Sequence, residues 1–244
     1  MVAHPGLLAD DRYRMPMTSE VDPPATRVWD LPTRAFHWTL ALAIVVLVIT
    51  GHVGGNALVW HMRAGYGVFT LLLFRLLWGF VGGRWSRFAS FVYGPGTLLR
   101  YLRGQATPGE QLDVGHNPLG SFSVFALLGL LAVQVATGLV ADDEIATTGP
   151  LNRLVSNATA GKATGWHTEA GQWLLIGLVV LHVGAILFHR IHLGKDLVGP
   201  MLTGDKLLPA GTPAATDTLP TRGLALVLVA ACAALVAWVV ALGN

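Results

Sequence analysis

The chain has 244 residues, of which 53% are apolar and only 12% are charged, and its formal net charge is +2. Soluble domains carry about 25% charged residues, so this composition excludes that class and indicates an integral membrane protein. We expect membrane lipid, and no nucleic acid, as a partner. The single cysteine, Cys232, excludes a cysteine-ligated iron–sulfur cluster within the chain and is interpreted as a packing residue.

Residues 1–30 combine several prolines with charged side chains and show no apolar periodicity. This pattern predicts a flexible polar arm. The first long apolar stretch begins only after the arm, too far from the N-terminus for a cleavable signal peptide, so we expect it to be retained.

Five apolar segments follow, each close to the roughly 20 residues that a helix needs to cross the hydrocarbon core of a bilayer. They are Ala35–Gly54, Arg63–Gly82, Pro118–Val140, His167–His189 and Gly223–Leu242. We therefore predict an all-α integral membrane protein. It consists of a four-helix membrane domain over residues 31–206, followed by a linker and a fifth C-terminal transmembrane helix over residues 207–244.

The basic residues of the connections predict the orientation, because cytoplasmic loops carry an excess of Lys and Arg. Three of the polar segments are basic, through Arg12, Arg14, Arg27 and Arg34, then Arg84, Arg87, Arg100 and Arg103, and finally Arg190, Lys195, Lys206 and Arg222. The intervening connections are uncharged at 56–61 and contain three acidic residues at 142–144. These counts predict that the N-terminus lies in the cytoplasm.

Four histidines fall inside the predicted helices at two depths, His37 and His182 toward the inner face and His61 and His167 toward the outer face. An ionisable residue inside a membrane is a functional hypothesis by default. His167 and His182 are separated by about 22 Å along one helix and lean to the same side. Two histidines from different helices at each level fit a haem iron that is held from both faces, which favours electron transfer over oxygen binding.

Two other classes compete with this interpretation. The first is a metal or proton transporter lined by histidine. The second is a purely structural anchor, in which the histidines only form hydrogen bonds. Glu169 is the one acidic residue at the depth of these histidines, which argues against a carboxylate-rich metal site. His52 is interpreted as a structural residue.

Several short motifs together resemble the prokaryotic cytochrome b561 family, which includes the b-type cytochrome subunits of nickel–iron hydrogenases. They are Arg34-Ala35-Phe36-His37-Trp38, His61 followed by Gly65-Tyr66, Arg75 with Trp78-Gly79-Phe80, Gly115-His116-Asn117-Pro118-Leu119-Gly120 and the histidines of the fourth helix. The resemblance covers residues 27–206. It implies a four-helix unit in the inner membrane of a bacterium, with two haem b groups, one bound by His37 and His182 and the other by His61 and His167.

The chain departs from the family pattern in two respects. The family spaces the two ligands of the fourth helix by fourteen residues, whereas His167 and His182 are fifteen apart. A one-residue π-bulge, or a different lean of the ring, would accommodate the extra residue. The fifth helix lies outside the common unit and is interpreted as a packing or docking helix.

Further polar residues are candidates for contact with haem or quinone. Arg75 either pairs with the propionates of the inner haem or extends to lipid headgroups. His116 either caps the third helix or contacts a propionate. His189 shares a helix face with His182 but lies about 33 Å from His167 along the axis, so we assign iron ligation to His182. We expect quinone to meet the inner haem near Arg34, His37, His116 and His189.

The sequence thus predicts transmembrane electron transfer through two haem b groups, between the quinone pool of a respiratory chain and a redox partner. That partner is cytochrome c, or a dehydrogenase or hydrogenase subunit. The alternative within electron transfer is an anchor subunit of a larger dehydrogenase or hydrogenase complex. Whether the chain is itself a quinone oxidoreductase, and whether it forms a homo-oligomer, stays open.

Overall fold

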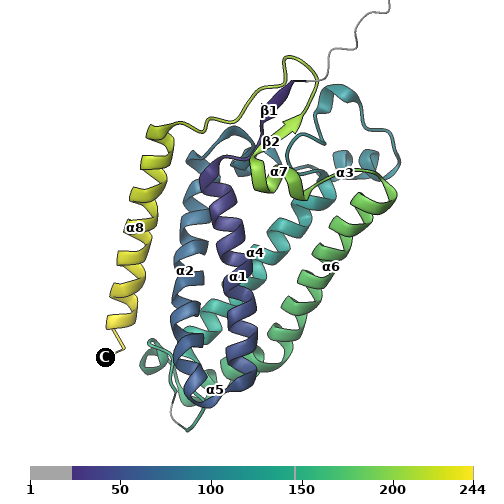
Figure 1. The fold of residues 1–244 in the computed structure, drawn as a ribbon. Helices are drawn as coiled ribbons and strands as arrows, with labels where there is room; N and C mark the ends of the chain where they lie inside the picture. The colour runs from purple at the N-terminus through teal and green to yellow at the C-terminus, as the bar shows by residue number, and fades with distance from the viewer. Residues whose placement is uncertain (1–23, 146, 244) are drawn as a thin grey trace, which may run out of the picture.

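In the computed structural model, which describes residues 24–145 and 147–243, the chain is a bundle of long helices with a small two-stranded sheet at one end (Figure 1). The strands are β1 (Ala25–Arg27) and β2 (Asp205–Leu207), and the helices are α1 (Leu31–Val53), α2 (Leu58–Val81), α3 (Pro95–Leu102), α4 (Pro118–Val140), α5 (Asn157–Gly165), α6 (Gly171–His192), α7 (Val198–Thr203) and α8 (Leu219–Ala241). Short 3₁₀ turns and one π-helical turn join them.

Five helical segments of the described chain are long and apolar enough to cross a membrane: Leu31–Val53, Gly55–Val81, Pro118–Val140, Asn157–His192 and Leu219–Ala241. The predicted all-α membrane fold with a fifth C-terminal helix is therefore confirmed. The span Pro118–Val140 agrees with the prediction at both ends. The first and last spans begin four residues earlier than expected.

The early starts of these helices have a local cause. Asp30 caps α1, since its carboxylate accepts a hydrogen bond of 2.8 Å from the backbone N–H of Thr33. Thr218 caps α8 in the same way, and in both helices a proline follows within the first turn. Proline is well placed there, because its missing N–H would have no partner in the helix. Polar capping residues therefore begin each helix ahead of its apolar run.

The helices pack around an apolar core that runs along the bundle. Phe36 and Leu40 of α1 contact Phe74 and Trp78 of α2 in the core, and Phe74 stacks on Trp78 with ring centroids 5.5 Å apart. Helix α8 lies along α2 on one flank and α6 lies on the opposite flank (Figure 1). Cys232 of α8 is buried in the same core as a free thiol, as its interpretation as a packing residue predicts.

One end of the bundle, which we call the sheet end, holds β1, β2, α3 and α7, and the other, the α5 end, holds α5 and the loop before it (Figure 1). The strands pair antiparallel with Ala25 opposite Leu207 and Arg27 opposite Asp205. A second small core lies beneath them and contains Val28, Trp29, Trp85, Val114, Leu208 and Ala215.

This second core corrects the predicted domain boundaries. The flexible arm predicted over residues 1–30 is wrong for its last residues, because β1 pairs with β2 and Val28 to Asp30 are almost fully buried. Residues 1–23 lie outside the described residues. The predicted boundary between 206 and 207 falls within β2. Apolar residues that come before and after the predicted membrane domain in the sequence thus pack together in one folded unit.

Candidate functional site

Two histidines face each other inside the bundle near the α5 end. His61 lies in the first turn of α2, and His167 lies in the π-helical turn Trp166–Ala170 that leads into α6. Their ring centroids are 5.9 Å apart, and the ring planes form an angle of 81°. Two imidazoles that bind one metal through nitrogens about 2 Å away would have centroids about 6 Å apart. The observed separation matches that geometry.

The space between these rings is a cavity of about 410 Å³. This volume lies within the roughly 300–1,000 Å³ typical of cofactor sites. Leucine, valine and glycine residues of α1, α2 and α4 form a large part of its wall, and polar residues such as His52, Gln134 and Gln172 also line it. The wall is therefore mainly apolar, and the rings of His61 and His167 both border the cavity.

Hydrogen bonds to backbone carbonyls fix which nitrogen of each ring is available. His61 Nδ1 lies 3.0 Å from the carbonyl oxygen of Leu47, and His167 Nδ1 lies 2.9 Å from that of Gln134. A carbonyl oxygen only accepts, so in each ring Nδ1 carries the hydrogen and donates it. The remaining nitrogen, Nε2, keeps its lone pair, which is the form of imidazole that binds a metal.

The π-helical turn explains the spacing of fifteen residues between His167 and His182. A π turn inserts one extra residue into a helix without breaking it, and Trp166–Ala170 contains His167 itself. The sequence allowed either a π-bulge or a different lean of the ring to absorb the extra residue, and the structure contains the π-bulge. The turn brings His167 opposite His61 while α6 continues regularly toward the sheet end.

A second group of histidines lies toward the sheet end, where His37 of α1, His182 of α6 and His116 influence one another electrostatically. The Nδ1 atom of His37 is buried and has no hydrogen-bond partner among the described residues. The Nδ1 atom of His182 lies 3.4 Å from the hydroxyl of Ser123. The structure thus brings the ring of His61 opposite that of His167, and it groups His37 and His182 with His116 at the other end of the bundle.

Arg75 and His116 accompany the sheet-end pair. Arg75 is only 3% exposed, and its guanidinium lies over the ring of Phe88 at 4.7 Å, with Nη1 unpartnered among the described residues. It therefore points into the bundle, and the alternative of extension to lipid headgroups is wrong. His116 packs between Trp29 and Phe91, and burial lowers its pKa to about 3, so its ring is neutral.

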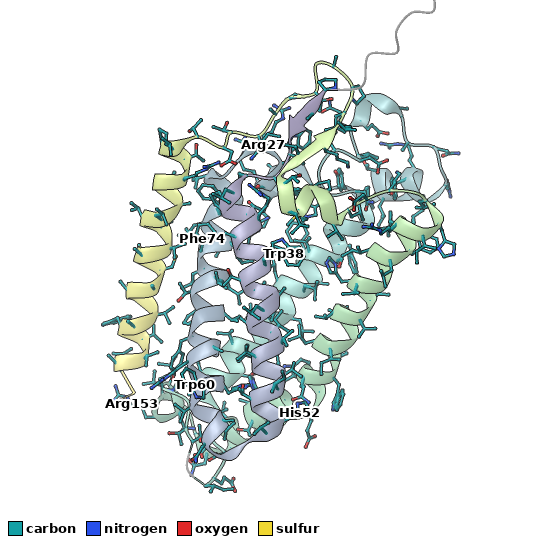
Figure 2. The ribbon with its side chains drawn as sticks, in the orientation of Figure 1. Arg27, Trp38, His52, Trp60, Phe74 and Arg153 are labelled. Atoms are coloured by element: carbon teal, nitrogen blue, oxygen red, sulfur yellow. The ribbon has the colours of Figure 1, made fainter. Side chains whose placement is uncertain are left out.

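The remaining residues named from the sequence form contacts of their own. Arg34 donates to the carbonyl oxygen of Leu202 in α7. His189 lies near the end of α6 and its ring bonds to the carbonyl oxygen of Ala185 at 2.8 Å. The side chain of Asn117, not that of His116, caps α4. His52 bonds to the carbonyl oxygen of Val48 and lies at the α5 end (Figure 2).

The sequence model of the prokaryotic cytochrome b561 family matches residues 28–204. The chain belongs to the prokaryotic cytochrome b561 family. A relative from Cupriavidus necator, a probable Ni/Fe-hydrogenase B-type cytochrome subunit, is 30% identical over 212 residues, which cover 74% of this chain and 86% of the relative. The probable Ni/Fe-hydrogenase 1 B-type cytochrome subunit of Escherichia coli K12 is 27% identical over 211 residues, covering 72% and 88% of the two chains. No solved structure matches the chain.

Family membership makes the chain a haem b-binding membrane cytochrome with a role in electron transfer, and a histidine-lined transporter is not favoured. The residues present fit haem. Within the described part of the chain, the α5-end cavity has two facing imidazoles whose Nε2 atoms form no hydrogen bond, and buried polar atoms of His37, Arg75 and His116 at the sheet end have no protein partner. Buried polar groups normally have partners, so these orphaned atoms fit a bound group with anionic substituents.

Sequence reasoning missed two features that shape the sites of this cytochrome. Gln134 is 8% exposed, and its side chain donates to the carbonyl oxygen of His167 at 3.1 Å. Asp30 is fully buried and connects the start of α1 to the end of α2 at the sheet end. A polar residue in the apolar run 118–140 and an Asp directly before a helix are the signals that would have pointed to them.

Proposed function

We propose that the chain binds two haem b groups and transfers electrons across the membrane between quinone and a redox partner. His61 and His167 would hold the haem at the α5 end, and His37 and His182 the haem at the sheet end. The observation that carries this proposal is the 5.9 Å separation of the facing His61 and His167 rings. When bound, haem supplies a one-electron carrier whose potential the protein adjusts through ligands, burial and nearby charge.

The residues of the chain would have distinct roles around the two groups. Each pair of imidazoles closes both faces of an iron, which leaves no position for oxygen and favours electron transfer. The buried guanidinium of Arg75 would face the anionic propionates of the sheet-end haem, with the neutral ring of His116 beside it. The apolar walls would exclude water from both groups.

We infer that the sheet end lies in the cytoplasm. The basic residues of α3, of the segment after α6 and of β2 gather at that end, where Lys195 pairs with Asp113 at 2.9 Å. The loop at the α5 end contains Asp142, Asp143 and Glu144 against Arg153 and Lys162. By the positive-inside tendency the N-terminus would be cytoplasmic, and five spans would place the C-terminus on the opposite side, with the protein in the bacterial inner membrane.

We propose a hydrogenase as the redox partner, because the similar chains from Escherichia coli and Cupriavidus necator are named as Ni/Fe-hydrogenase B-type cytochrome subunits. In that arrangement the chain would also anchor the soluble subunits to the membrane. A cytochrome c, a different dehydrogenase subunit and a homo-oligomer are the competing partners. Co-purification followed by identification of the bound protein distinguishes them, and recovery of a cytochrome c instead of a hydrogenase would contradict the assignment.

We propose that quinone exchanges electrons with the sheet-end haem, next to Arg34 and His189. Both residues lie at the sheet end of helices that contain a proposed ligand of that haem, α1 with His37 and α6 with His182. His116, which packs between Trp29 and Phe91, would lie beside the haem on the same side. If quinone-dependent reduction is unchanged when Arg34 and His189 are both substituted, this location is wrong.

The test of the ligand assignment is a set of histidine substitutions read by haem content and absorption spectra. His61→Leu and His167→Leu should each remove the α5-end haem and leave a second haem b. His52→Leu is the matched control, since His52 lines the same cavity but bonds to its own helix, and it should retain both haems. At the sheet end, His182→Leu should remove one haem and His189→Leu should not. Retention of both haems in a stably inserted His61→Leu protein would contradict the proposal.

A further inference from the structure

Two helices of the bundle contain the same short pattern where they approach the α5 end. In α1 the residues are Leu47-Val48-Ile49-Thr50-Gly51, and in α4 they are Gln134-Val135-Ala136-Thr137-Gly138. Valine, threonine and glycine occupy matching positions. The first, second and fifth residues of both segments line the α5-end cavity. We call these two segments the Thr-Gly seats.

The first residue of each Thr-Gly seat accepts a hydrogen bond from one of the two facing histidines. The carbonyl of Leu47 accepts from His61, which comes from α2, and the carbonyl of Gln134 accepts from His167, which comes from the turn before α6. In both cases the histidine belongs to the next long helix, which returns through the bundle beside the seat. The two halves of the site thus repeat one arrangement.

The glycine of each seat leaves room for the ring. A Cβ added at Gly138 would lie 2.9 Å from Cε1 of His167, and a Cβ added at Gly51 would lie 3.3 Å from Cε1 of His61. In a helix the carbonyl of residue i already accepts from the N–H of residue i+4, which here is the glycine. Because that glycine has no side chain, the second lone pair of the carbonyl stays accessible to the imidazole.

The threonine of each seat turns its hydroxyl back onto its own helix. Thr50 donates to the carbonyl of Val46 at 2.7 Å, and Thr137 donates to that of Val133 at 2.8 Å. Thr137 Oγ1 also lies 3.1 Å from the carbonyl oxygen of Gln134 and 3.4 Å from Nδ1 of His167. The hydroxyls therefore add polar contacts around the carbonyls that hold the rings.

The sheet-end pair has no comparable support. His37 Nδ1 has no hydrogen-bond partner among the described residues, and His182 Nδ1 has only the hydroxyl of Ser123 at 3.4 Å. A hydrogen bond from the non-coordinating nitrogen of a histidine to a carbonyl raises the basicity of the coordinating nitrogen. More electron density on the iron stabilises its oxidised form.

We propose that the two Thr-Gly seats are positioning elements that fix the tautomer and ring plane of His61 and His167 and thereby lower the midpoint potential of the α5-end haem. This inference rests on the proposed function, because it requires a haem between these two rings. It assigns to Gly51 and Gly138 a role that neither packing of helices nor room for the macrocycle requires, namely exposure of one carbonyl lone pair to each ligand.

The test uses Gly138→Ala, with Gly129→Ala as the matched control on the same helix. A Cβ added at Gly129 meets no atom within 4 Å. Gly129 is nine residues before Gly138, a rotation of about 900° or two and a half turns, so the two positions lie on opposite sides of α4. Redox titration of the haem b absorption bands and electron paramagnetic resonance of the oxidised protein are the two measurements. They report the potential and the relative orientation of the two ligand rings.

In Gly138→Ala the potential of the α5-end haem should rise and its low-spin signal should shift, while the sheet-end haem keeps its wild-type values. Gly51→Ala should show the same effect to a smaller degree, because its added Cβ is farther from the ring. If Gly138→Ala loses the α5-end haem, the potential and signal of Gly51→Ala are measured in its place. If both glycine variants give the potentials and signals of Gly129→Ala, the inference is overturned.

Failure of this inference is distinguishable from failure of the proposed function. If His61→Leu and His167→Leu remove one haem while the glycine variants leave its potential and signal unchanged, the ligand assignment stands and the role of the seats is wrong. If the histidine variants retain both haems, the ligand assignment itself is wrong and the seats have no haem to position.

Discussion

The indole N–H of Trp78 donates a hydrogen bond of 3.1 Å to the carboxylate of Asp30 and joins the end of α2 to the start of α1. The same carboxylate accepts from the hydroxyl of Ser86 at 2.6 Å and from the backbone N–H of Gly83 at 3.2 Å. Asp30 and Trp78 are both fully buried. One carboxylate therefore fixes the two helices that provide His37 and His61.

Replacement of Asp30 should destabilise the whole bundle. Asp30→Ala leaves several buried donors without an acceptor, and loss of such a buried charged partner costs about 3–5 kcal/mol. Asp113→Ala is the control at the same end, because its ion pair with Lys195 is half exposed and should contribute at most about 1 kcal/mol. Thermal unfolding of the purified protein in detergent measures both. Equal effects of the two substitutions would contradict the structural role of Asp30.

Arg75 should set the potential of the haem that we propose at the sheet end. Its buried positive charge stabilises the reduced iron, which has one positive charge fewer, so Arg75→Gln should lower the potential of that haem and leave the other unchanged. Arg84→Gln is the control, because Arg84 lies at the same end but is exposed. Redox titration of the haem b bands gives both values. A sheet-end potential that is unchanged or higher in Arg75→Gln would contradict the placement of this guanidinium.

Asp217 should anchor helix α8 to the membrane domain. Its carboxylate is bound by Arg222 at 2.8 Å and by Arg27 of β1 at 2.9 Å, and only 5% of its side chain is exposed. Through these two partners the carboxylate connects the start of α8 to β1. Asp217→Asn should therefore lower the thermal midpoint, whereas Asp205→Asn, which affects only the more exposed contact of Arg27, should have the smaller effect.

The contribution of Asp217 should depend on pH. The hydrogen bonds from Arg222 hold the pKa of this carboxyl below its ordinary value of 3.8. A group whose pKa is lowered on folding stabilises the native state in full above its unfolded-state pKa, and this stabilisation is lost as the pH falls through the lowered pKa. The difference in thermal midpoint between wild type and Asp217→Asn should thus shrink as the pH falls below about 4. A constant difference from pH 7 to pH 3 would show that the charge of Asp217 is not involved.

The long apolar helices and the pairing of the histidines were predictable from the sequence. The runs around Leu127 and Val180 are long enough to span a bilayer, and the depth of a histidine in such a run fixes which other histidine it can meet. The start of α1 was not predictable from hydropathy, because it depends on the cap at Asp30. Helix α5 was missed for a similar reason, since its residues are small and polar.

The hydrogen bonds that hold the rings of His61 and His167 were not predictable from the sequence either. The carbonyls of Leu47 and Gln134 become partners of His61 and His167 only when α1 meets α2 and α4 meets the π-helical turn. The similarity of the two Thr-Gly seats is visible in the sequence, but its meaning depends on these contacts between helices. The small sheet also depends on a pairing across almost 180 residues, which no local pattern indicates.

The number of haem groups per chain tests the central claim most directly. A pyridine haemochrome assay on the purified cytochrome, combined with quantitative amino-acid analysis, gives the ratio of haem b to protein. The proposed ligand pairs His61–His167 and His37–His182 predict a ratio of two in the wild type and of one in His61→Leu. A ratio of one in the fully occupied wild-type protein would contradict the account.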